Sequence, residues 1–454
     1  MPLILPSNSI SAGGYEVDNS LRFDDGSSDY LSRTPASAGN RKTMTYSFWL
    51  KKTTNNYYFY FFSTGNAGAV PRSVFGFSLD KLYIAFNPTG SSWNEIFTNA
   101  LFRDVSAWYH VVVAIDTTQS TASNRTKIYV NGEQITSFSS ASYVSQNTDL
   151  PNNNSSIPHF IGKNTATGTE YYDGYMAEVC FIDGQQLDPT SFGEFDADTG
   201  IWKPIDVSGL TFGTNGFYLD FENSGSLGAD VSGNGNNFTV NNLTSIDQTT
   251  DTPTNNYATW NPLMSLSTGN AFPTALTDGN TINSDTRSGG DARSLSTIAV
   301  PRTNKWYYEC KVISGGTYIS VGLYQYLGNA IPTKSVRYYG GSGVKKLDGT
   351  STSYGATFTT GDIIGCLADI ENNQITFYKN GASQGVISYT FASGEDYFMT
   401  AGDEAGTSHS VAGNFGNPAF TISSGNSDPN GYGNFEYSTN GGYALNTKNL
   451  AEYG

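Results

Sequence analysis

Apolar and polar residues alternate over short stretches along most of the chain. Residues 44–50 read Met-Thr-Tyr-Ser-Phe-Trp-Leu, and similar runs recur at 306–312 and 374–381. A period of two places one apolar face on a core, so each run predicts a half-buried strand. The run at 108–116 is longer and almost continuously apolar, which predicts a strand covered on both faces. No helical period separates these strands.

Turn residues mark where the strands reverse. Asn131-Gly132 and Asn380-Gly381 each divide two apolar runs, and Asn-Gly supplies the positive φ angles of a type I′ hairpin. The stretch 189–195 predicts a single helical turn. Short strands joined in this way specify antiparallel sandwiches. The fold class is therefore predicted to be all-β, with two antiparallel β-sandwich (jelly-roll) domains.

The spacing of the strands divides the chain into five segments. The sandwiches are expected at 15–205 and 301–425. The stretch between them, 206–300, has few apolar anchors and much Thr, Asn, Asp and Pro, so we expect an extended, ordered connector. An N-terminal extension is expected at 1–14. The C-terminal extension, 426–454, lacks apolar periodicity and predicts a loosely packed or partner-bound tail.

Composition narrows the class of protein. Of 454 residues, 14% are charged, 14% are aromatic and 50 are glycine, which suits strands and turns and excludes a helical bundle. The net charge of −16 would repel a phosphate backbone, so no nucleic-acid partner is expected. No apolar run approaches the roughly 20 residues of a membrane span, so no membrane insertion is expected. The opening residues are too short and uncharged for a signal peptide.

The residues needed for catalysis are missing from the sequence pattern. Cys180, Cys310 and Cys366 lie far apart in apolar runs and are expected to be reduced core residues. The three histidines are also dispersed. The Glu-x-Asp-x-x-Glu strand of laminarinase-type glycosidases, a nucleophile elbow and a P-loop are all absent. We therefore expect no catalytic residues and no enzyme activity.

Several motifs resemble two known modules. The strand 45–49, the run 108–113, the hairpin at 128–132 and the strand 175–179 together resemble a laminin-G-like, concanavalin-A-like jelly roll. The runs 306–309, 319–323, 361–366 and 375–381, with Asn414-Phe415-Gly416, resemble a SPRY domain. The pairing of these modules is similar to virion proteins of tailed, particularly marine, bacteriophages. This resemblance implies recognition or assembly, because both modules are mostly binding folds.

Two polar clusters are candidates for calcium. Laminin-G-like and pentraxin-like domains often hold calcium at the sandwich rim through Asp, Asn and carbonyl oxygens, which is hard-oxygen chemistry. The candidate ligands are Asp24, Asp25 and Asp29 in the first loop and Asp230, Asn234 and Asn236 in the connector. The alternative for both clusters is an ordinary turn, since Asx side chains bond their own backbone. Apart from calcium at one of these clusters, no cofactor is expected.

Tyrosine-rich loops are candidates for ligand contact. A ring face stacks on the apolar face of a sugar while polar neighbours take the hydroxyls. The alternatives are a protein interface, or a plain surface or core position. In a SPRY domain the ligand surface is built from loops at one end, which the resemblance places at 337–346. The candidates are Tyr57, Tyr58, Tyr171, Tyr172, Arg337, Tyr338 and Tyr339.

These observations together favour a non-enzymatic structural protein of a phage particle at the virion surface. The expected role is a tail-associated adhesin or fibre component that contacts a host surface glycan or receptor. The alternatives are a capsid decoration protein and a glycan-degrading enzyme. Exposed strand edges must be paired or protected, so we expect a homo-oligomer or docking onto other virion proteins.

Overall fold

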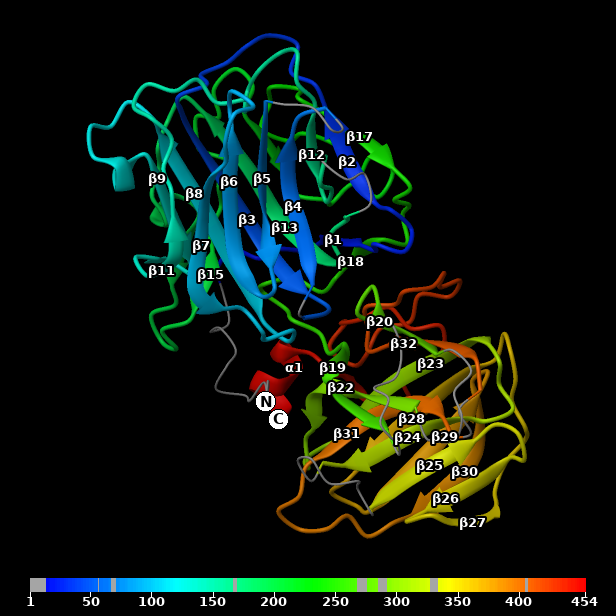
Figure 1. The fold of residues 1–454 in the computed structure, drawn as a ribbon. Coiled ribbons are helices and arrows are strands. Elements are labelled where there is room, and N and C mark those ends of the chain that lie inside the picture. Colours follow the sequence, from blue (N-terminus) through cyan, green and yellow to red (C-terminus); the bar gives the residue numbers. More distant parts are fainter. Residues whose placement is uncertain are drawn as a thin grey trace. The chain divides into compact units, whose positions relative to one another are not determined.

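The computed structural model describes residues 14–55, 57–66, 71–165, 170–267, 276–284, 292–326, 334–404 and 407–454. Contacts divide the chain into a first unit within Ile10–Thr254 and a second within Asn255–Gly454. Both units are built almost entirely of strands (Figure 1). The expected N-terminal extension, 1–14, lies outside the described residues except for Gly14.

Two sheets face each other in the first unit. Within the described residues one sheet has the order β10-β9-β8-β3-β13-β1-β18, with β16 also paired to β13. Its strands are β1 (Ser20–Phe23), β3 (Thr43–Lys52), β8 (Trp108–Asp116), β9 (Thr126–Val130), β10 (Glu133–Gln134), β13 (Gly174–Asp183), β16 (Phe217–Leu219) and β18 (Gln248–Thr249). All of these pairings are antiparallel.

The second sheet of this unit has the order β11-β7-β6-β5-β4-β12-β2-β17. Its strands are β2 (Tyr30–Arg33), β4 (Tyr58–Thr64), β5 (Arg72–Ser78), β6 (Lys81–Asn87), β7 (Asn94–Leu101), β11 (Phe138–Ala141), β12 (His159–Ile161) and β17 (Thr239–Asn241). Within the described residues this unit also contains a smaller ribbon and two 3-10 turns. They are β14 (Gly193–Phe195), β15 (Trp202–Pro204), η2 (Ala122–Asn124) and η3 (Pro189–Ser191).

The alternation within β3 and β8 explains how the first unit packs. Tyr46 and Phe48 point into the core between the sheets, whereas Trp49 packs on the outer face with Trp202. Val112 on β8 likewise contributes to a cluster on the outer face. The expected two-sided burial of 108–116 is therefore confirmed, because residues beyond β13 fold back over this sheet.

The stretch expected to be a connector is divided between the two units. Residues 206–254 belong to the first unit, where β16, β17 and β18 extend its sheets. Residues 255–300 belong to the second unit and supply edge strands. Sparse apolar residues suffice for this arrangement, because Phe217 and Phe238 are buried in the first core and Trp260 in the second.

The second unit is also a sandwich. Within the described residues its sheets have the orders β19-β22-β31-β24-β25-β26-β27 and β20-β21-β32-β23-β28-β29-β30. The strands of the first sheet are β19 (Trp260–Ser267), β22 (Ala292–Val300), β24 (Ile319–Gln325), β25 (Ser335–Tyr339), β26 (Val344–Leu347), β27 (Thr350–Ser353) and β31 (Tyr397–Asp403). Those of the other are β20 (Leu276–Thr277), β21 (Thr281–Ser284), β23 (Trp306–Ser314), β28 (Ile363–Asp369), β29 (Gln374–Lys379), β30 (Ala382–Ser388) and β32 (His409–Asn414).

The C-terminal tail is packed against the second sandwich. The strand β33 (Tyr443–Ala444) pairs in parallel with β23, and α1 (Thr447–Tyr453) follows it. The buried carboxylate of Glu309 accepts hydrogen bonds from the backbone N–H groups of Glu436 and Tyr437, at 3.0 and 2.9 Å. Phe435 is fully buried. Scattered single anchors therefore hold a segment whose lack of periodicity led us to expect loose packing.

Local expectations about turns and cysteines are confirmed. Asn131 and Gly132 have φ angles of 49° and 82° and join β9 to β10, and Asn380-Gly381 repeats this geometry. The three cysteines are buried and free of disulfides. No helix in the described ranges is long and apolar enough to cross a bilayer.

A buried carboxylate joins distant parts of the first unit. Glu178 lies where a bulge interrupts the pairing of β13 with β3, and it accepts hydrogen bonds from the hydroxyls of Tyr15 (3.0 Å) and Tyr218 (2.7 Å). Burial raises the pKa of Glu178 from 4.5 to about 7, although the two hydroxyls act in the opposite direction. The bulge thus turns the carboxyl group of Glu178 toward two tyrosines that are distant from it in the sequence.

Glu178→Gln should flatten the pH dependence of stability. Because the folded-state pKa lies above the unfolded value, the native form holds the proton more tightly, and stability falls as pH rises from about 4.5 to about 7. This contribution, on the order of 3 kcal/mol, should be missing from the variant, since glutamine accepts both hydroxyls without titrating. Urea unfolding at pH 5 and pH 8 measures it. Equal pH slopes for both proteins would refute the assignment.

Candidate functional site

The register of two strands brings acidic residues together at one rim of the first sandwich. β1 pairs with β13 so that Phe23 faces Gly174, which places Asp24, just after β1, beside Asp173, just before β13. Carboxylate oxygens of Asp24, Asp25 and Asp173 lie within 4.8 Å of one another. We call these three residues the rim carboxylates.

A fourth aspartate supports the loop that carries this cluster. Asp29 is buried, and its Oδ2 accepts a hydrogen bond from the backbone N–H of Asp24 at 3.1 Å. Its other oxygen, Oδ1, is buried and has no hydrogen-bond partner. Gly26 donates its N–H to Asp24 Oδ1 at 2.9 Å. The loop is therefore an Asx turn whose carboxylates retain unused acceptor capacity.

The electrostatics of the loop disfavour negative charge. Burial raises the pKa values of Asp24 and Asp25, and repulsion by Asp24 raises that of Asp25 further. Burial raises the pKa of Asp29 to about 6. A divalent cation would relieve both the repulsion and the loss of hydration.

The donor set fits a hard cation. Calcium takes six to eight oxygen ligands, carboxylates, carbonyls and waters, at about 2.3 to 2.6 Å. The rim carboxylates would supply the protein's charged ligands, and the orphaned oxygen of Asp29 is a further acceptor in the same loop. Asp173 was missing from the expected ligand set, although it ends the tyrosine-rich stretch 170–173. Only the pairing of β1 with β13 brings Asp173 to the loop of Asp24 and Asp25.

The other expected calcium cluster has a structural explanation. Asp230 accepts hydrogen bonds from the backbone N–H groups of Tyr218, Ser232 and Asn236. The amide groups of Asn234 and Asn236 both donate to the carbonyl of Gly216. These side chains close a loop on its own backbone, which is the turn alternative.

Aromatic rings adjoin the rim carboxylates along the chain. Tyr30 follows Asp29, and its ring lies 6.0 Å from that of Phe160 and 6.1 Å from that of Tyr171. Lys163 Nζ lies 4.2 Å from the Tyr30 ring centroid. All four side chains are partly exposed. We call Tyr30, Phe160 and Tyr171 the ring cluster; only Tyr171 was among the expected ligand residues.

The other tyrosines of the first unit that were expected to contact a ligand differ in their exposure. Tyr57 and Tyr58 are 49% and 41% exposed, so they are available to a partner. Tyr172 is fully buried, and its hydroxyl donates to the carbonyl of Lys51 at 3.1 Å. The structure therefore removes Tyr172 from the surface, because alternation turns it inward while Tyr171 faces outward.

The expected ligand residues of the second unit are mostly interior. Arg337 is buried and forms ion pairs with Glu404, as do Arg293 and Lys346. Tyr338 is fully buried in the core and donates its hydroxyl to Ala356. Tyr339 is partly exposed, with Lys346 Nζ 4.3 Å from its ring centroid. Alternate residues of a strand face opposite ways, so Tyr338 points into the core while Tyr339 shares the other face with Arg337. Of these three, only Tyr339 keeps a surface position, because Arg337 is buried in its ion pair with Glu404.

Each half of the chain contains a region that matches a known protein family. Residues 25–186 match the concanavalin A-like lectin/glucanases superfamily in its laminin G form, and residues 305–401 match the SPRY domain. The chain carries these two domains in that order. The concanavalin A-like match includes Asp25 and Asp173, and the SPRY match includes Tyr339.

Curated relatives resemble only part of this chain. The Ran-binding proteins 9/10 homolog of Drosophila melanogaster is 37% identical over 106 residues, 21% of this chain and 11% of that protein. Ran-binding protein 9 of Danio rerio is 40% identical over 89 residues, 18% of this chain and 15% of that protein. The chain thus spans less than a fifth of the length of either relative.

Two solved structures show similarity at low identity. The SPRY domain of human HERC1 is 18% identical, with a TM-score of 0.28, and covers 34% of this chain and 96% of that one. Domains LG4-5 of the mouse laminin alpha1 chain are 10% identical, with a TM-score of 0.31, and cover 88% of this chain and 89% of that one.

Calcium should bind the full chain and stabilise it through the rim carboxylates. At a concentration about 100 times the Kd, binding to the native state alone adds about 2.7 kcal/mol. Asp24→Asn and Asp173→Asn should each remove most of this gain, whereas Glu133→Gln, on exposed β10, should retain it. Calorimetric titration and calcium-dependent Tm measure both effects. Unchanged binding in the Asp173→Asn variant would exclude this site.

Proposed function

We propose that the protein is a non-enzymatic recognition protein that binds a glycan at the rim of its first domain. The observation that carries this proposal is the convergence of the rim carboxylates within 4.8 Å, with Tyr171 of the ring cluster two residues before Asp173 in the chain. A cation held by carboxylates can accept sugar hydroxyls in place of waters. An aromatic face can stack on the apolar face of the ring.

The proposed setting is the surface of a phage particle. The pairing of a laminin-G-type domain with a SPRY domain supports a tail-associated adhesin or fibre component, with capsid decoration as the alternative. The net charge of −16 supports a surface that avoids nonspecific nucleic-acid binding. In this arrangement the first domain contacts the host surface, and the protein associates with itself or with other virion proteins.

Glycan hydrolysis is the second candidate, because converging carboxylates are also what a glycosidase needs. Retaining enzymes hold two carboxyl groups about 5 Å apart on either side of the scissile bond. Here Asp24 and Asp25 are consecutive residues of one turn, and three carboxylates share one site. That arrangement favours ligation of a cation over a division into acid and nucleophile.

Binding to immobilised bacterial envelope polysaccharides should require calcium and should be strengthened by Tyr171. The full chain should bind in calcium and lose binding in EDTA. Tyr171→Ala should weaken binding roughly 2- to 10-fold, the usual value of one aromatic contact. Tyr318→Ala, which removes a tyrosine 40% exposed in the second domain, serves as the matched control.

Two results would argue against this function. Binding whose affinity is unchanged by both EDTA and Tyr171→Ala would place the glycan site elsewhere. Release of reducing ends from the same polysaccharides, lost in Asp173→Asn, would identify a hydrolase instead of a binding protein.

A further inference from the structure

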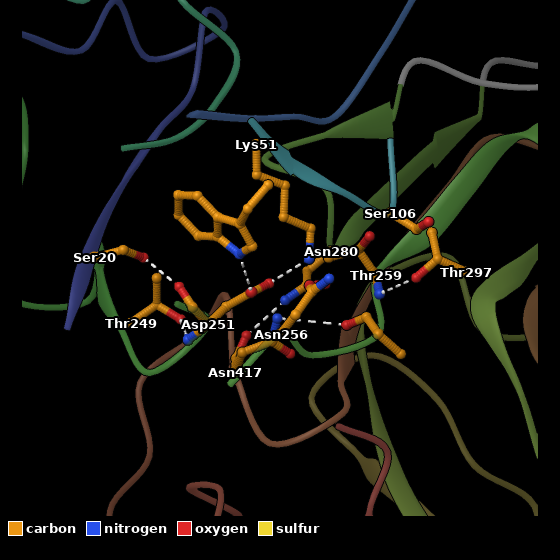
Figure 2. A network of polar contacts seen from close by, with 12 residues as sticks. Ser20, Lys51, Ser106, Thr249, Asp251, Asn256, Thr259, Asn280, Thr297 and Asn417 are labelled. Atoms are coloured by element: carbon orange, nitrogen blue, oxygen red, sulfur yellow. Dashed lines mark hydrogen bonds and ion pairs between the residues drawn. The ribbon is translucent and has the colours of Figure 1, made fainter. Parts of the chain in front are cut away.

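A buried lysine and a buried aspartate meet at close range in the first unit. Lys51 Nζ, at the end of β3, lies 2.6 Å from Oδ2 of Asp251, which follows β18, and neither side chain is exposed. The indole Nε1–H of Trp108 donates to the other carboxylate oxygen, Oδ1, at 3.1 Å. Figure 2 shows Lys51 and Asp251 facing each other, with Ser20 and Thr249 on the Asp251 side.

The strand register holds the lysine in place. Lys51 on β3 is opposite Trp108 on β8 and Tyr175 on β13. Residues directly opposite in an antiparallel pair project to the same face, and Lys51 Nζ lies 5.6 Å from the Tyr175 ring centroid. The amine is thus confined between two aromatic side chains.

Separate hydrogen bonds hold the aspartate. Its backbone N–H donates to Thr249 Oγ1 at 3.2 Å, and its carbonyl accepts from Ser20 Oγ at 2.6 Å. Ser20 and Thr249 are themselves paired between β1 and β18. Both reacting groups are therefore positioned by the fold before any chemistry occurs.

Burial favours the neutral form of the lysine. Burial lowers the pKa of Lys51, although the charge of Asp251 acts in the opposite direction. Moving one proton along the Nζ–H···Oδ2 hydrogen bond converts the ion pair into an amine and a carboxylic acid, which a dry site tolerates better than two charges. A desolvated, neutral lysine is a nucleophile.

We propose that Lys51 and Asp251 condense to an intramolecular isopeptide bond. The lone pair of Nζ attacks Cγ of the protonated carboxyl group, and the developing charge on Oδ1 is stabilised by the Trp108 N–H. The Cγ–Oδ2 bond then breaks. Oδ2 leaves as water, carrying the proton it received from the ammonium and a second proton from nitrogen. An ammonium and a carboxylate become an amide and water, with no oxidation or reduction.

Proximity lowers the activation barrier of this condensation. Well-oriented intramolecular reactions reach effective molarities of about 10⁵ to 10⁸ M, far above any concentration of free amine and acid. The product also replaces two buried charges by one neutral amide, which removes the desolvation cost of the ion pair.

The neighbouring residue provides an internal comparison. Lys52 Nζ lies 2.8 Å from Asp80 Oδ1, and both side chains are equally buried. A second cation, Arg103, lies at this carboxylate with its Nε 3.2 Å from Asp80 Oδ2, and the charge of a guanidinium is permanent. Lys52 also donates to Asn55 and to the carbonyl of Phe102. We expect this second pair to remain an ion pair.

Mass spectrometry of the full chain tests the bond directly. After denaturation, the intact protein should be lighter than its sequence by one water molecule, and proteolysis should release the Lys51 and Asp251 peptides as one branched species. Lys52 and Asp80 should appear in ordinary linear peptides. Asp251→Ala should show its full sequence mass whether or not it folds, because the acceptor carbon is gone.

Either of two results would overturn the proposal. One is a wild-type protein of full mass whose Lys51 and Asp251 peptides separate. The other is a loss of water that persists in Asp251→Ala, since the condensation would then involve other residues.

Discussion

The pairing of β1 with β13 is the constraint on which the first domain depends. Its register places Phe23 opposite Gly174 and thereby puts Asp24 beside Asp173. A slip of one residue would move each side chain to the other face of its strand and separate the carboxylates. The same strand β13 pairs with β3 on its other edge and carries Glu178 at its bulge. The central strand β13 therefore positions the rim carboxylates, core side chains between the sheets and the buried Glu178.

Buried carboxylates anchor the segments of the chain that lack periodic apolar residues. Glu178 accepts hydrogen bonds from the hydroxyls of Tyr15 and Tyr218, and Glu309 accepts them from the backbone N–H groups of residues 436–437. Each carboxylate is in the interior, where leaving it without donors would cost several kcal/mol. Segments with few hydrophobic residues are therefore held at specific points.

The local sequence pattern was enough to predict the all-β class, the two-sided burial of 108–116 and the Asn-Gly hairpins. It could not predict the path of 206–300 or 426–454, because single anchors such as Phe238, Trp260 and Phe435 have no period. The candidate site was half predicted. Asp24 and Asp25 were found from the composition of one loop, but Asp173 depends on which strands pair, a long-range property. Tyr172 and Tyr338 were misplaced because a run of tyrosines does not reveal which member faces inward.

The place of Asp251 in the chain affects how the domain would respond to mechanical load. The chain leaves the first unit after Thr254, three residues beyond Asp251, and β18 is only two residues long. A pull on this exit would otherwise peel β18 from β1 one hydrogen bond at a time. The link to Lys51 instead passes tension into β3, whose ten residues are hydrogen-bonded along both edges. Tension at the exit is then borne by a ten-residue strand with a neighbour on each edge instead of by the two-residue β18 alone.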